Sequence, residues 1–213
     1  MRLPHSGATV LHRGDPIDKA AAAVIMLHGR GSSAPDILEL QPEIAYPGFA
    51  YIAPQADENS WYPKSFLSPR SENQPWIDGA LALVDSIVTE IETHGIGADK
   101  IILLGFSQGA CLALEYAARR PRPYGGIVGL SGGLIGAEIH EEDYSGDLAG
   151  SVVFLGCSDT DSHIPKERVQ SSAEILRKRG GEVVLTFYPG IGHTIVEDEI
   201  LFARKIMRAV AQS

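Results

Sequence analysis

The chain is short of cysteine and of long apolar runs, and each shortage excludes a class of protein. Only two cysteines, Cys111 and Cys157, occur among 213 residues, so a disulfide-stapled secreted fold is excluded and free thiols are expected. The longest uninterrupted apolar run, residues 20–27, is far shorter than the roughly 20 residues that a membrane-spanning helix needs. The first residues lack the apolar core of a signal peptide. We therefore expect a cytoplasmic protein without membrane insertion.

Positive charge is also scarce. Lysine and arginine number 18 against 27 aspartates and glutamates, which gives a net charge of −9. A surface of this sign repels phosphate backbones and anionic lipid heads, so neither nucleic acid nor a membrane surface is an expected partner. No linker or repeat divides the chain, and a chain of this length buries a sufficient core by itself. We therefore expect residues 1–213 to form a single domain.

Short apolar segments alternate with longer segments of helical periodicity along the chain. This order is typical of a parallel sheet with helices on both faces. The clearest helix is predicted at residues 77–91, where apolar residues recur at the spacing of one helical face. We predict an α/β fold whose central sheet is mostly parallel and has about seven strands. Strands are expected at residues 8–11, 20–27, 49–53, 100–105, 126–130, 151–156 and 182–187, and further helices at residues 34–40, 108–119, 166–179 and 196–211.

Two glycine-flanked serines fit the pattern of an acyl-transfer nucleophile. Such a serine sits on a sharp turn between a strand and a helix, with a glycine on either side because a Cβ there would clash. Residues 105–109 and residues 129–133 both read Gly-x-Ser-x-Gly. Ser107 follows an apolar strand and precedes a largely apolar helix, whereas no helical face follows Ser131. We therefore predict Ser107 as the nucleophile and a loop position for Ser131.

A serine hydroxyl needs a histidine base, which a carboxylate orients. His193 follows the last predicted strand and precedes the last helix, so its loop reaches the same edge of the sheet as Ser107. Asp159 and Asp161 both follow the preceding strand, and Asp161 is favoured because it lies just before Pro165, where the next helix begins. We expect Asp159 to accept backbone N–H groups within its own turn.

Two backbone amides are expected to stabilise the charge that develops on the carbonyl oxygen. One belongs to Gln108, which follows the nucleophile, and the other to Arg30, in a glycine loop after an early strand.

The glycine loop at residues 29–34 also fits the dinucleotide fingerprint Gly-x-Gly-x-x-Ala, with Asp57 further along the chain as a ribose-binding acid. An NAD-dependent oxidoreductase is therefore an alternative, although it leaves the serine, aspartate and histidine unexplained. A non-catalytic ligand-binding protein of the same fold is a third hypothesis.

Together these motifs resemble the phospholipase/carboxylesterase family of α/β-hydrolases, which includes the acyl-protein thioesterases. The resemblance covers nearly the whole chain and rests on four motifs, at residues 28–31, 105–109, 161–165 and 192–193. It implies an α/β-hydrolase fold and a serine carboxylesterase, with the same triad and the same two oxyanion amides that the residues themselves indicate. The expected mechanism requires neither a metal nor an organic cofactor.

The expected substrates are small to medium acyl esters, with thioesters or lysophospholipids as alternatives. Residues 54–76 leave the same strand edge as the site, so Trp61 and Phe66 are predicted to wall the pocket, with Ile164 opposite. An ordinary loop with aromatic anchors is the alternative. Arg30 stands where the thioesterases usually have an apolar residue, which argues against their substrate. The sequence leaves the natural ester and the oligomeric state open, a homodimer included.

Overall fold

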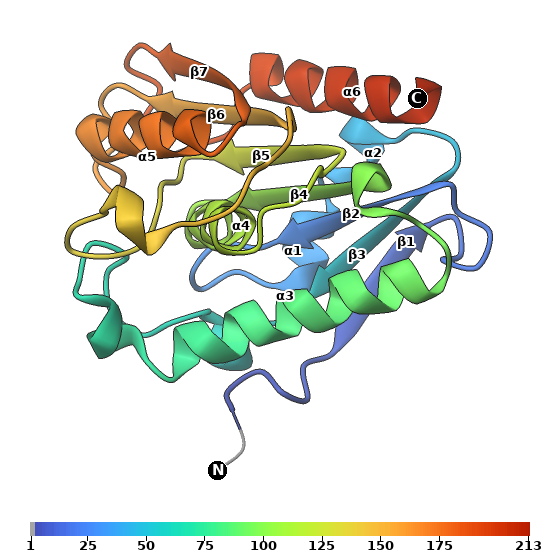
Figure 1. Cartoon of the computed structure of the whole chain (residues 1–213), viewed down its shortest axis with the longest axis horizontal. Coiled ribbons are helices and arrows are strands. Elements are labelled where there is room, and N and C mark those ends of the chain that lie inside the picture. The colour runs from blue at the N-terminus through green and yellow to red at the C-terminus, as the bar shows by residue number, and fades with distance from the viewer. Residues whose placement is uncertain (1–2) are drawn as a thin grey trace.

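The fold is built around one twisted sheet. In the computed structural model, which describes residues 3–213, seven strands pair in the order β1-β3-β2-β4-β5-β6-β7 (Figure 1). Strand β1 runs antiparallel to β3, and every other neighbouring pair is parallel. The predicted, mostly parallel sheet of an α/β-hydrolase is therefore confirmed. The strands are β1 (Val10–Gly14), β2 (Ala22–Leu27), β3 (Phe49–Pro54), β4 (Ile101–Phe106), β5 (Gly126–Leu130), β6 (Val152–Ser158) and β7 (Glu182–Tyr188).

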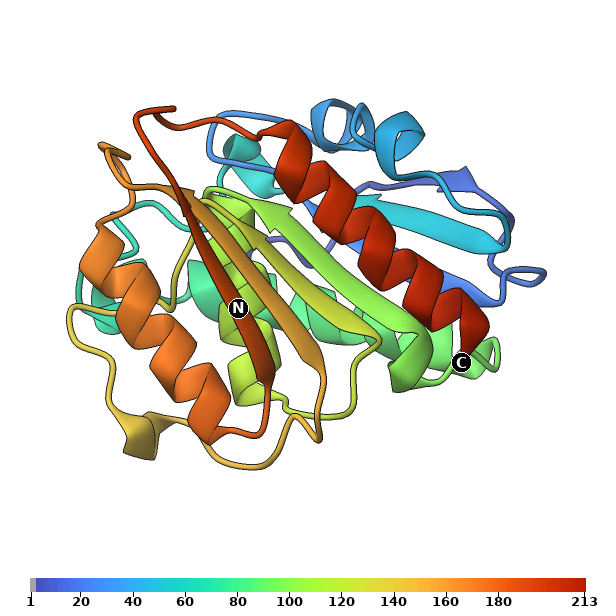
Figure 2. The same cartoon turned by 90° about the horizontal axis from the view of Figure 1, so that it is seen from above.

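Helices cover both faces of the sheet (Figure 2). Helices α3, α4 and α5 pack on one face, and α1, α2 and α6 on the other. The sequence pattern predicts all of these helices except α2, whose four residues are too few to show helical periodicity. Their bounds are α1 (Ala34–Leu38), α2 (Gln41–Ile44), α3 (Trp76–Thr93), α4 (Gln108–Arg119), α5 (Lys166–Lys178) and α6 (Glu197–Gln212). Short 3-10 turns lie at η1 (Asp57–Asn59), η2 (Arg70–Asn73), η3 (Ala98–Lys100) and η4 (Glu141–Asp143).

Strand β2 illustrates why the apolar segments of the sequence become central strands. Successive side chains of a strand point to opposite faces. Ile25 and Leu27 therefore join the cluster beneath α3 and α4, while Val24 and Met26 join the cluster beneath α1 and α6. All four side chains are fully buried. A strand covered on both faces must be apolar throughout, which is the pattern that the sequence shows.

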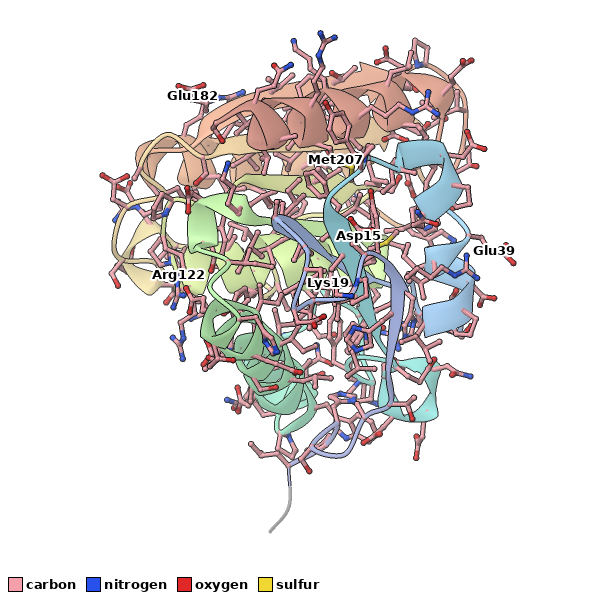
Figure 3. All side chains as sticks on the ribbon, turned by 90° about the vertical axis from the view of Figure 1, so that its right-hand side faces the viewer. Asp15, Lys19, Glu39, Arg122, Glu182 and Met207 are labelled. Carbon is pink, nitrogen blue, oxygen red and sulfur yellow. The ribbon has the colours of Figure 1, made fainter. Side chains whose placement is uncertain are left out.

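Most charged side chains lie outside these layers, and the buried carboxylates Glu115 and Glu199 are exceptions. In Figure 3, Glu39 and Glu182 lie at the periphery, whereas Met207 lies between α6 and the sheet and is fully buried. Among the described residues, no helix is both long enough and apolar enough to cross a membrane.

The strand register brings the loops of the predicted site to one edge of the sheet. Leu27 pairs with Gly105, and Gly105 pairs with Gly129, so β2, β4 and β5 end at nearly the same level. Strands β6 and β7 run parallel to them and end on the same side. In open α/β sheets, ligands bind at this carboxyl edge, where the loops converge.

Candidate active site

Ser107 lies on a sharp turn between β4 and α4. Its φ of 56° is in the left-handed region that residues other than glycine seldom adopt, and its amide donates a 2.9 Å hydrogen bond to the Leu130 carbonyl. A Cβ at Gly105 would collide with the Gly109 backbone, and a Cβ at Gly109 would collide with the Leu27 carbonyl. The two glycines of the motif therefore let α4 begin directly against the ends of β2 and β4, and the turn presents the Ser107 side chain above the sheet edge.

A continuous chain of hydrogen bonds connects three loops at this edge. His193 Nε2 lies 2.8 Å from Ser107 Oγ, and His193 Nδ1 lies 2.7 Å from Asp161 Oδ2. Because a carboxylate only accepts, Nδ1 carries the hydrogen and Nε2 is left to accept the serine hydroxyl. An imidazole in this arrangement is placed to accept a proton from the serine hydroxyl. The structure thus brings together Ser107, Asp161 and His193, which lie far apart in the sequence.

The Asp161 carboxylate is held by more than the histidine. Its side chain is fully buried, and Oδ1 accepts backbone hydrogen bonds from His163 at 2.8 Å and Ile164 at 3.1 Å. Burial by itself raises the pKa of Asp161, but the hydrogen bonds from His193 and from the two amides outweigh burial and lower the pKa. The group is therefore ionised at neutral pH and places a negative charge beside the imidazole.

Asp159 has a different role from the one that the sequence indicates. Its Oδ1 accepts a 2.8 Å hydrogen bond from the amide of Gly190, and its own amide donates to the Tyr188 carbonyl at 3.1 Å. Both partners belong to the strand and loop that lead to His193, not to the turn of Asp159 itself. The prediction of a bond within the turn is therefore wrong. The loop after β7 lies next to the loop after β6, and Asp159 joins the two.

Ser131, the second glycine-flanked serine, occupies the end of β5 and no helix begins there. Its φ of 53° resembles that of Ser107, and its amide donates to the Gly156 carbonyl at 2.7 Å. The residue is 1% exposed, and its Oγ has no hydrogen-bond partner among the described residues. A substrate carbonyl has no access to a hydroxyl buried in this way. The local backbone is thus similar at the two serines, and access and the histidine distinguish them.

The glycine loop after β2 lies directly beside Ser107. A Cβ placed on Gly29 would lie 3.5 Å from the Ser107 Cβ, which shows how closely the two turns approach. The backbone N–H groups of Arg30 and Gln108 donate no hydrogen bond within residues 3–213. Both residues line the cavity that contains Ser107. Two unengaged N–H groups next to a nucleophile fit the pattern of an oxyanion hole.

The buried His28 side chain holds the glycine loop in place through two hydrogen bonds, a role that the sequence does not reveal. The Ala56 amide donates to Nε2 at 3.1 Å, so Nε2 has no hydrogen, and Nδ1 donates to the Gly29 carbonyl at 2.8 Å. Only a neutral imidazole satisfies both bonds. Burial lowers the pKa of His28, which agrees with a neutral ring. The histidine therefore ties the glycine loop to the segment that follows β3.

The cavity beside Ser107 has a volume of about 410 Å³. Of the residues predicted to wall it, Phe66 and Ile164 line the cavity, but Trp61 does not. Trp61 is fully buried beneath the wall, where its indole N–H donates to the His28 carbonyl at 2.8 Å. The neighbouring Tyr62 faces the cavity instead. In an irregular segment the side-chain direction follows from the path of the loop, which no periodic pattern in the sequence records.

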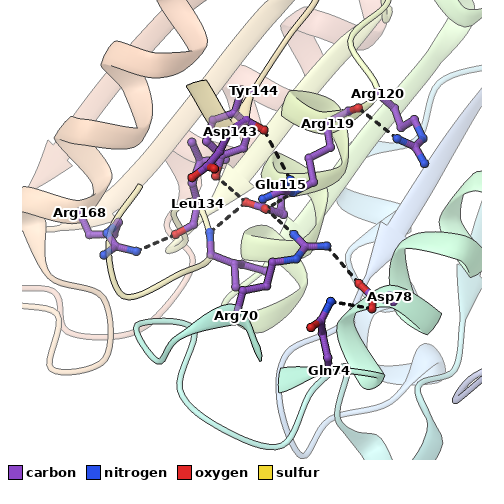
Figure 4. Close-up of polar contacts among 11 residues, drawn as sticks. Arg70, Gln74, Asp78, Glu115, Arg119, Arg120, Leu134, Asp143, Tyr144 and Arg168 are labelled. Carbon is purple, nitrogen blue, oxygen red and sulfur yellow. Dashed lines mark hydrogen bonds and ion pairs between the residues drawn. The ribbon is translucent and has the colours of Figure 1, made fainter. Parts of the chain in front are cut away.

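Glu115 of α4 connects the two irregular segments around the cavity (Figure 4). Its side chain is fully buried, and Oε1 accepts from Arg70 Nη1 at 3.0 Å and from Arg119 Nε at 2.5 Å. Oε2 accepts from the Ile135 amide at 3.0 Å and from the Tyr144 hydroxyl at 3.1 Å. Arg70 lies between β3 and α3, whereas Ile135 and Tyr144 lie between β5 and β6. One carboxylate therefore satisfies donors from both segments.

These two segments also bond to one another at the cavity wall. The Gly136 amide donates a 2.8 Å hydrogen bond to the carbonyl of Phe66, which lines the cavity. Arg168 of α5 donates to the carbonyls of Leu134 and Gly136, at 3.0 and 2.6 Å. The wall near Phe66 is therefore fixed by hydrogen bonds from several elements.

The comparison with known families agrees with this geometry. The family described as Phospholipase/Carboxylesterase matches residues 14–211. The chain belongs to the phospholipase/carboxylesterase family. This confirms the resemblance that the four motifs indicate, and it places the chain among carboxylic ester hydrolases.

Relatives within this family extend the comparison. A crystal structure of a phospholipase/carboxylesterase from Dyadobacter fermentans is 45% identical, with a TM-score of 0.93 over 98% of this chain and 99% of that one. Acyl-protein thioesterase 1 of Saccharomyces cerevisiae is 28% identical, covering 86% of this chain and 90% of its own length. Acyl-protein thioesterase 1 of Gibberella zeae is 34% identical over 62% of this chain, and the match spans 57% of that relative.

The dinucleotide alternative does not fit the glycine loop as folded. The Gly31 amide donates to the Asn59 carbonyl at 2.7 Å, and the Arg30 side chain donates to Ser60. The Asp57 carboxylate accepts the amide of His5 at 2.7 Å instead of facing the loop. The segment after β3 therefore already occupies the Gly31 amide that a pyrophosphate would need, and family membership favours ester hydrolysis over hydride transfer.

Proposed function

We propose that this family member is a serine carboxylesterase that hydrolyses small to medium acyl esters through an acyl-enzyme. The observation that carries the proposal is the hydrogen-bond chain from Ser107 Oγ through His193 to Asp161. It is supported by the left-handed turn at Ser107 and by the two unengaged amides next to it. The cavity volume of about 410 Å³ lies within the range of roughly 300 to 1,000 Å³ that is common for small-molecule sites.

In the first half of the reaction, Ser107 Oγ bonds to the ester carbonyl carbon while His193 Nε2 takes the hydroxyl proton. The negative charge that develops on the carbonyl oxygen is stabilised by the backbone N–H groups of Arg30 and Gln108. Asp161 stabilises the imidazolium and holds its orientation. His193 then gives the proton to the alcohol oxygen as the carbon–oxygen bond breaks, which leaves the acyl group on Ser107.

In the second half, water repeats the same steps. His193 removes a proton from the water, whose oxygen attacks the acyl carbon, and the bond to Ser107 breaks as Oγ regains a proton. The carboxylic acid leaves and the free enzyme is restored. Thioesters and lysophospholipids present the same acyl carbon, so they remain candidate substrates of this site.

The test is turnover of p-nitrophenyl esters of increasing acyl length, from acetate to decanoate, by the wild-type protein, Ser107→Ala and Ser131→Ala. We expect Ser107→Ala to lose at least a thousandfold in kcat/KM and to lose labelling by a fluorophosphonate, because both require the nucleophile. Ser131→Ala is the matched control at the second elbow, and it should retain turnover and the label on Ser107. Loss of turnover in Ser131→Ala alone would contradict the assignment, and a non-catalytic binder would give no label.

We also infer that the protein works in the cytoplasm, which its two free, buried cysteines support. The homodimer that the sequence leaves open stays a prediction, and light scattering during gel filtration tests it.

A further inference from the structure

The cavity around Ser107 is cationic in a protein whose net charge is −9. Among the described residues that line it, none is an aspartate or a glutamate, whereas Arg30 and Lys64 both bring a positive charge. His163 adds an imidazole at the same cavity, and the centroid of its ring lies 4.8 Å from that of the His193 ring. The charged residues that line the cavity are therefore opposite in sign to the net charge of the molecule, and the nearby Asp161 carboxylate is already bonded to His193.

The Arg30 side chain is fixed without being neutralised. Nη1 donates to Ser60 Oγ at 3.1 Å and to the Pro63 carbonyl at 3.0 Å, and Nη2 donates to the Lys64 carbonyl at 2.6 Å. All three acceptors are uncharged, and no carboxylate in residues 3–213 lies within ion-pair distance of this guanidinium. The Arg30 Cζ atom lies over the Tyr62 ring, 5.7 Å from the ring centroid. A guanidinium has five N–H donors, so this arrangement leaves donors for a ligand.

Lys64 has a fixed backbone and a free ammonium group. Its amide donates to Asn73 Oδ1 at 2.8 Å, and the buried Asn73 side chain also donates to the Ser65 carbonyl at 2.9 Å. The exposed Lys64 ammonium makes no ion pair with any described residue, unlike that of Lys178, which lies 2.6 Å from Glu141. The side chain therefore extends into solvent from a well-anchored position at the cavity.

We propose that this cavity selects esters that also carry an anionic group, and that Arg30 and Lys64 bind that group. The inference rests on the proposed esterase function and names its substrate class. A carboxylate or a phosphate would replace water at both cations and form charge-assisted hydrogen bonds, which are stronger than neutral ones. Because the guanidinium is already held in place, little conformational entropy is lost on binding. A neutral ester of the same shape gains nothing from either charge.

The experiment compares pairs of esters in which the second group is anionic in one member and neutral in the other. On the alcohol side, 4-acetoxybenzoate and 4-acetoxyphenyl phosphate are compared with methyl 4-acetoxybenzoate, which separates carboxylate from phosphate recognition. On the acyl side, monomethyl glutarate is compared with dimethyl glutarate. Acid release is titrated at constant pH, and kcat/KM is measured for each ester. We expect at least one anionic ester to exceed its neutral counterpart on the order of tenfold at low ionic strength, and less in 0.5 M salt.

Charge-removing variants locate the effect. In Lys64→Gln and in Arg30→Gln, the ratio of anionic to neutral kcat/KM should fall on the order of three- to tenfold. The ratio is the readout because a general loss of folding or catalysis affects both esters of a pair and cancels. Lys205→Gln is the matched control, since it makes the same charge change on α6, on the opposite side of the sheet from α4, and should leave the ratio at the wild-type value.

The outcomes separate this inference from the esterase proposal. Turnover of neutral esters with no anionic preference in any pair overturns the inference and leaves the esterase function standing. A preference that Lys205→Gln reduces as much as Lys64→Gln assigns the effect to overall charge and also overturns it. A preference that neither Lys64→Gln nor Arg30→Gln changes also overturns the inference. If no ester is turned over and Ser107 takes no fluorophosphonate label, the proposed function itself fails.

Discussion

Gln108 Oε1 accepts a 2.9 Å hydrogen bond from the backbone amide of Trp61, and Gln108 Nε2 donates to the Tyr62 carbonyl at 2.8 Å. Gln108 is the first residue of α4 and follows Ser107 directly. Its side chain thus joins the turn of Ser107 to the segment that carries Tyr62 on the cavity wall. Through one residue, the position of the cavity wall is coupled to the position of Ser107.

We predict that Gln108→Ala destabilises the fold and alters the wall together. The substitution leaves the buried Trp61 amide without a partner and leaves the Tyr62 carbonyl with the Ser60 hydroxyl as its remaining donor. The free energy of unfolding should therefore fall by about 1 to 3 kcal/mol. The substitution should also raise KM for acyl esters more than it lowers kcat, because the backbone amide of residue 108 is retained. Urea unfolding and steady-state kinetics measure the two effects. Gln74→Ala removes an exposed hydrogen bond to Asp78 and serves as the control, with a change within about 0.5 kcal/mol.

Asp161→Asn should lower kcat by about 10³- to 10⁴-fold with little change in the unfolding midpoint. The amide would orient His193 in the wrong tautomer and would no longer stabilise the imidazolium. Asp159→Asn is the matched control at the adjacent aspartate, because an asparagine oxygen still accepts the Gly190 amide; its kcat should stay within about tenfold of wild type. Equal losses in the two variants would show that the loops require both charges, and would remove the distinction between them.

Glu115→Ala should lower the free energy of unfolding by about 3 to 5 kcal/mol. The substitution leaves Arg70 and Arg119 without their buried partner and the Ile135 amide without an acceptor. Denaturant unfolding of the purified variant measures the loss. Glu92→Ala removes a partly exposed ion pair with Arg122, which should cost no more than about 1 kcal/mol. Similar values for the two variants would contradict the role of Glu115 as the connection between the two segments.

Glu199 gives the fold a pH dependence of known sign. The residue is 1% exposed, Oε2 accepts the Val196 amide at 2.9 Å, and Oε1 has no partner among the described residues. Burial raises its pKa from 4.5 to about 7 in the folded state. The folded protein therefore holds a proton that the unfolded chain releases at lower pH. The stability linked to this group is fully present below pH 4.5 and is lost as the pH rises through about 7.

Glu199→Gln removes this titration. We expect the variant to gain about 1 to 3 kcal/mol in unfolding free energy at pH 8 relative to wild type, and to gain little at pH 4.5. Urea unfolding at both pH values gives the comparison. Glu197→Gln, one of the other acidic residues in the first turn of α6, serves as the control and should show no such pH-dependent gain. A gain of equal size at both pH values would mean that desolvation of the Glu199 carboxylate is not its source.

Much of the fold was predictable because its causes are local. Strands covered on both faces must be apolar throughout, and helices packed on one side must repeat their apolar residues every three or four positions. The turn at Ser107 requires glycine on either side because the backbones of Leu27 and Gly109 leave no space for a Cβ. Such constraints act within a few residues and leave a readable pattern. The four-residue α2 is too short to leave one.

The site could be predicted only in part. The types and order of Ser107, Asp161 and His193 follow from the chemistry of acyl transfer, but their contact depends on the sheet that aligns three strand ends. Trp61 was predicted in the pocket and lies beneath it, because the direction of a side chain in an irregular segment depends on what the segment packs against. The bond from Asp159 to Gly190 crosses between two loops, so its own turn gave no sign of it.

The sequence by itself determined the order of strands and helices, the glycine-flanked turn and the residue types available for acyl transfer. These follow from backbone sterics and from the periodic burial of neighbouring side chains. Only the tertiary structure decided which serine is accessible, which aromatic residue faces the cavity, and that no carboxylate of residues 3–213 pairs with Arg30 or Lys64 there. Those properties depend on contacts between residues distant in the chain, and such contacts are set by the packing of the whole molecule.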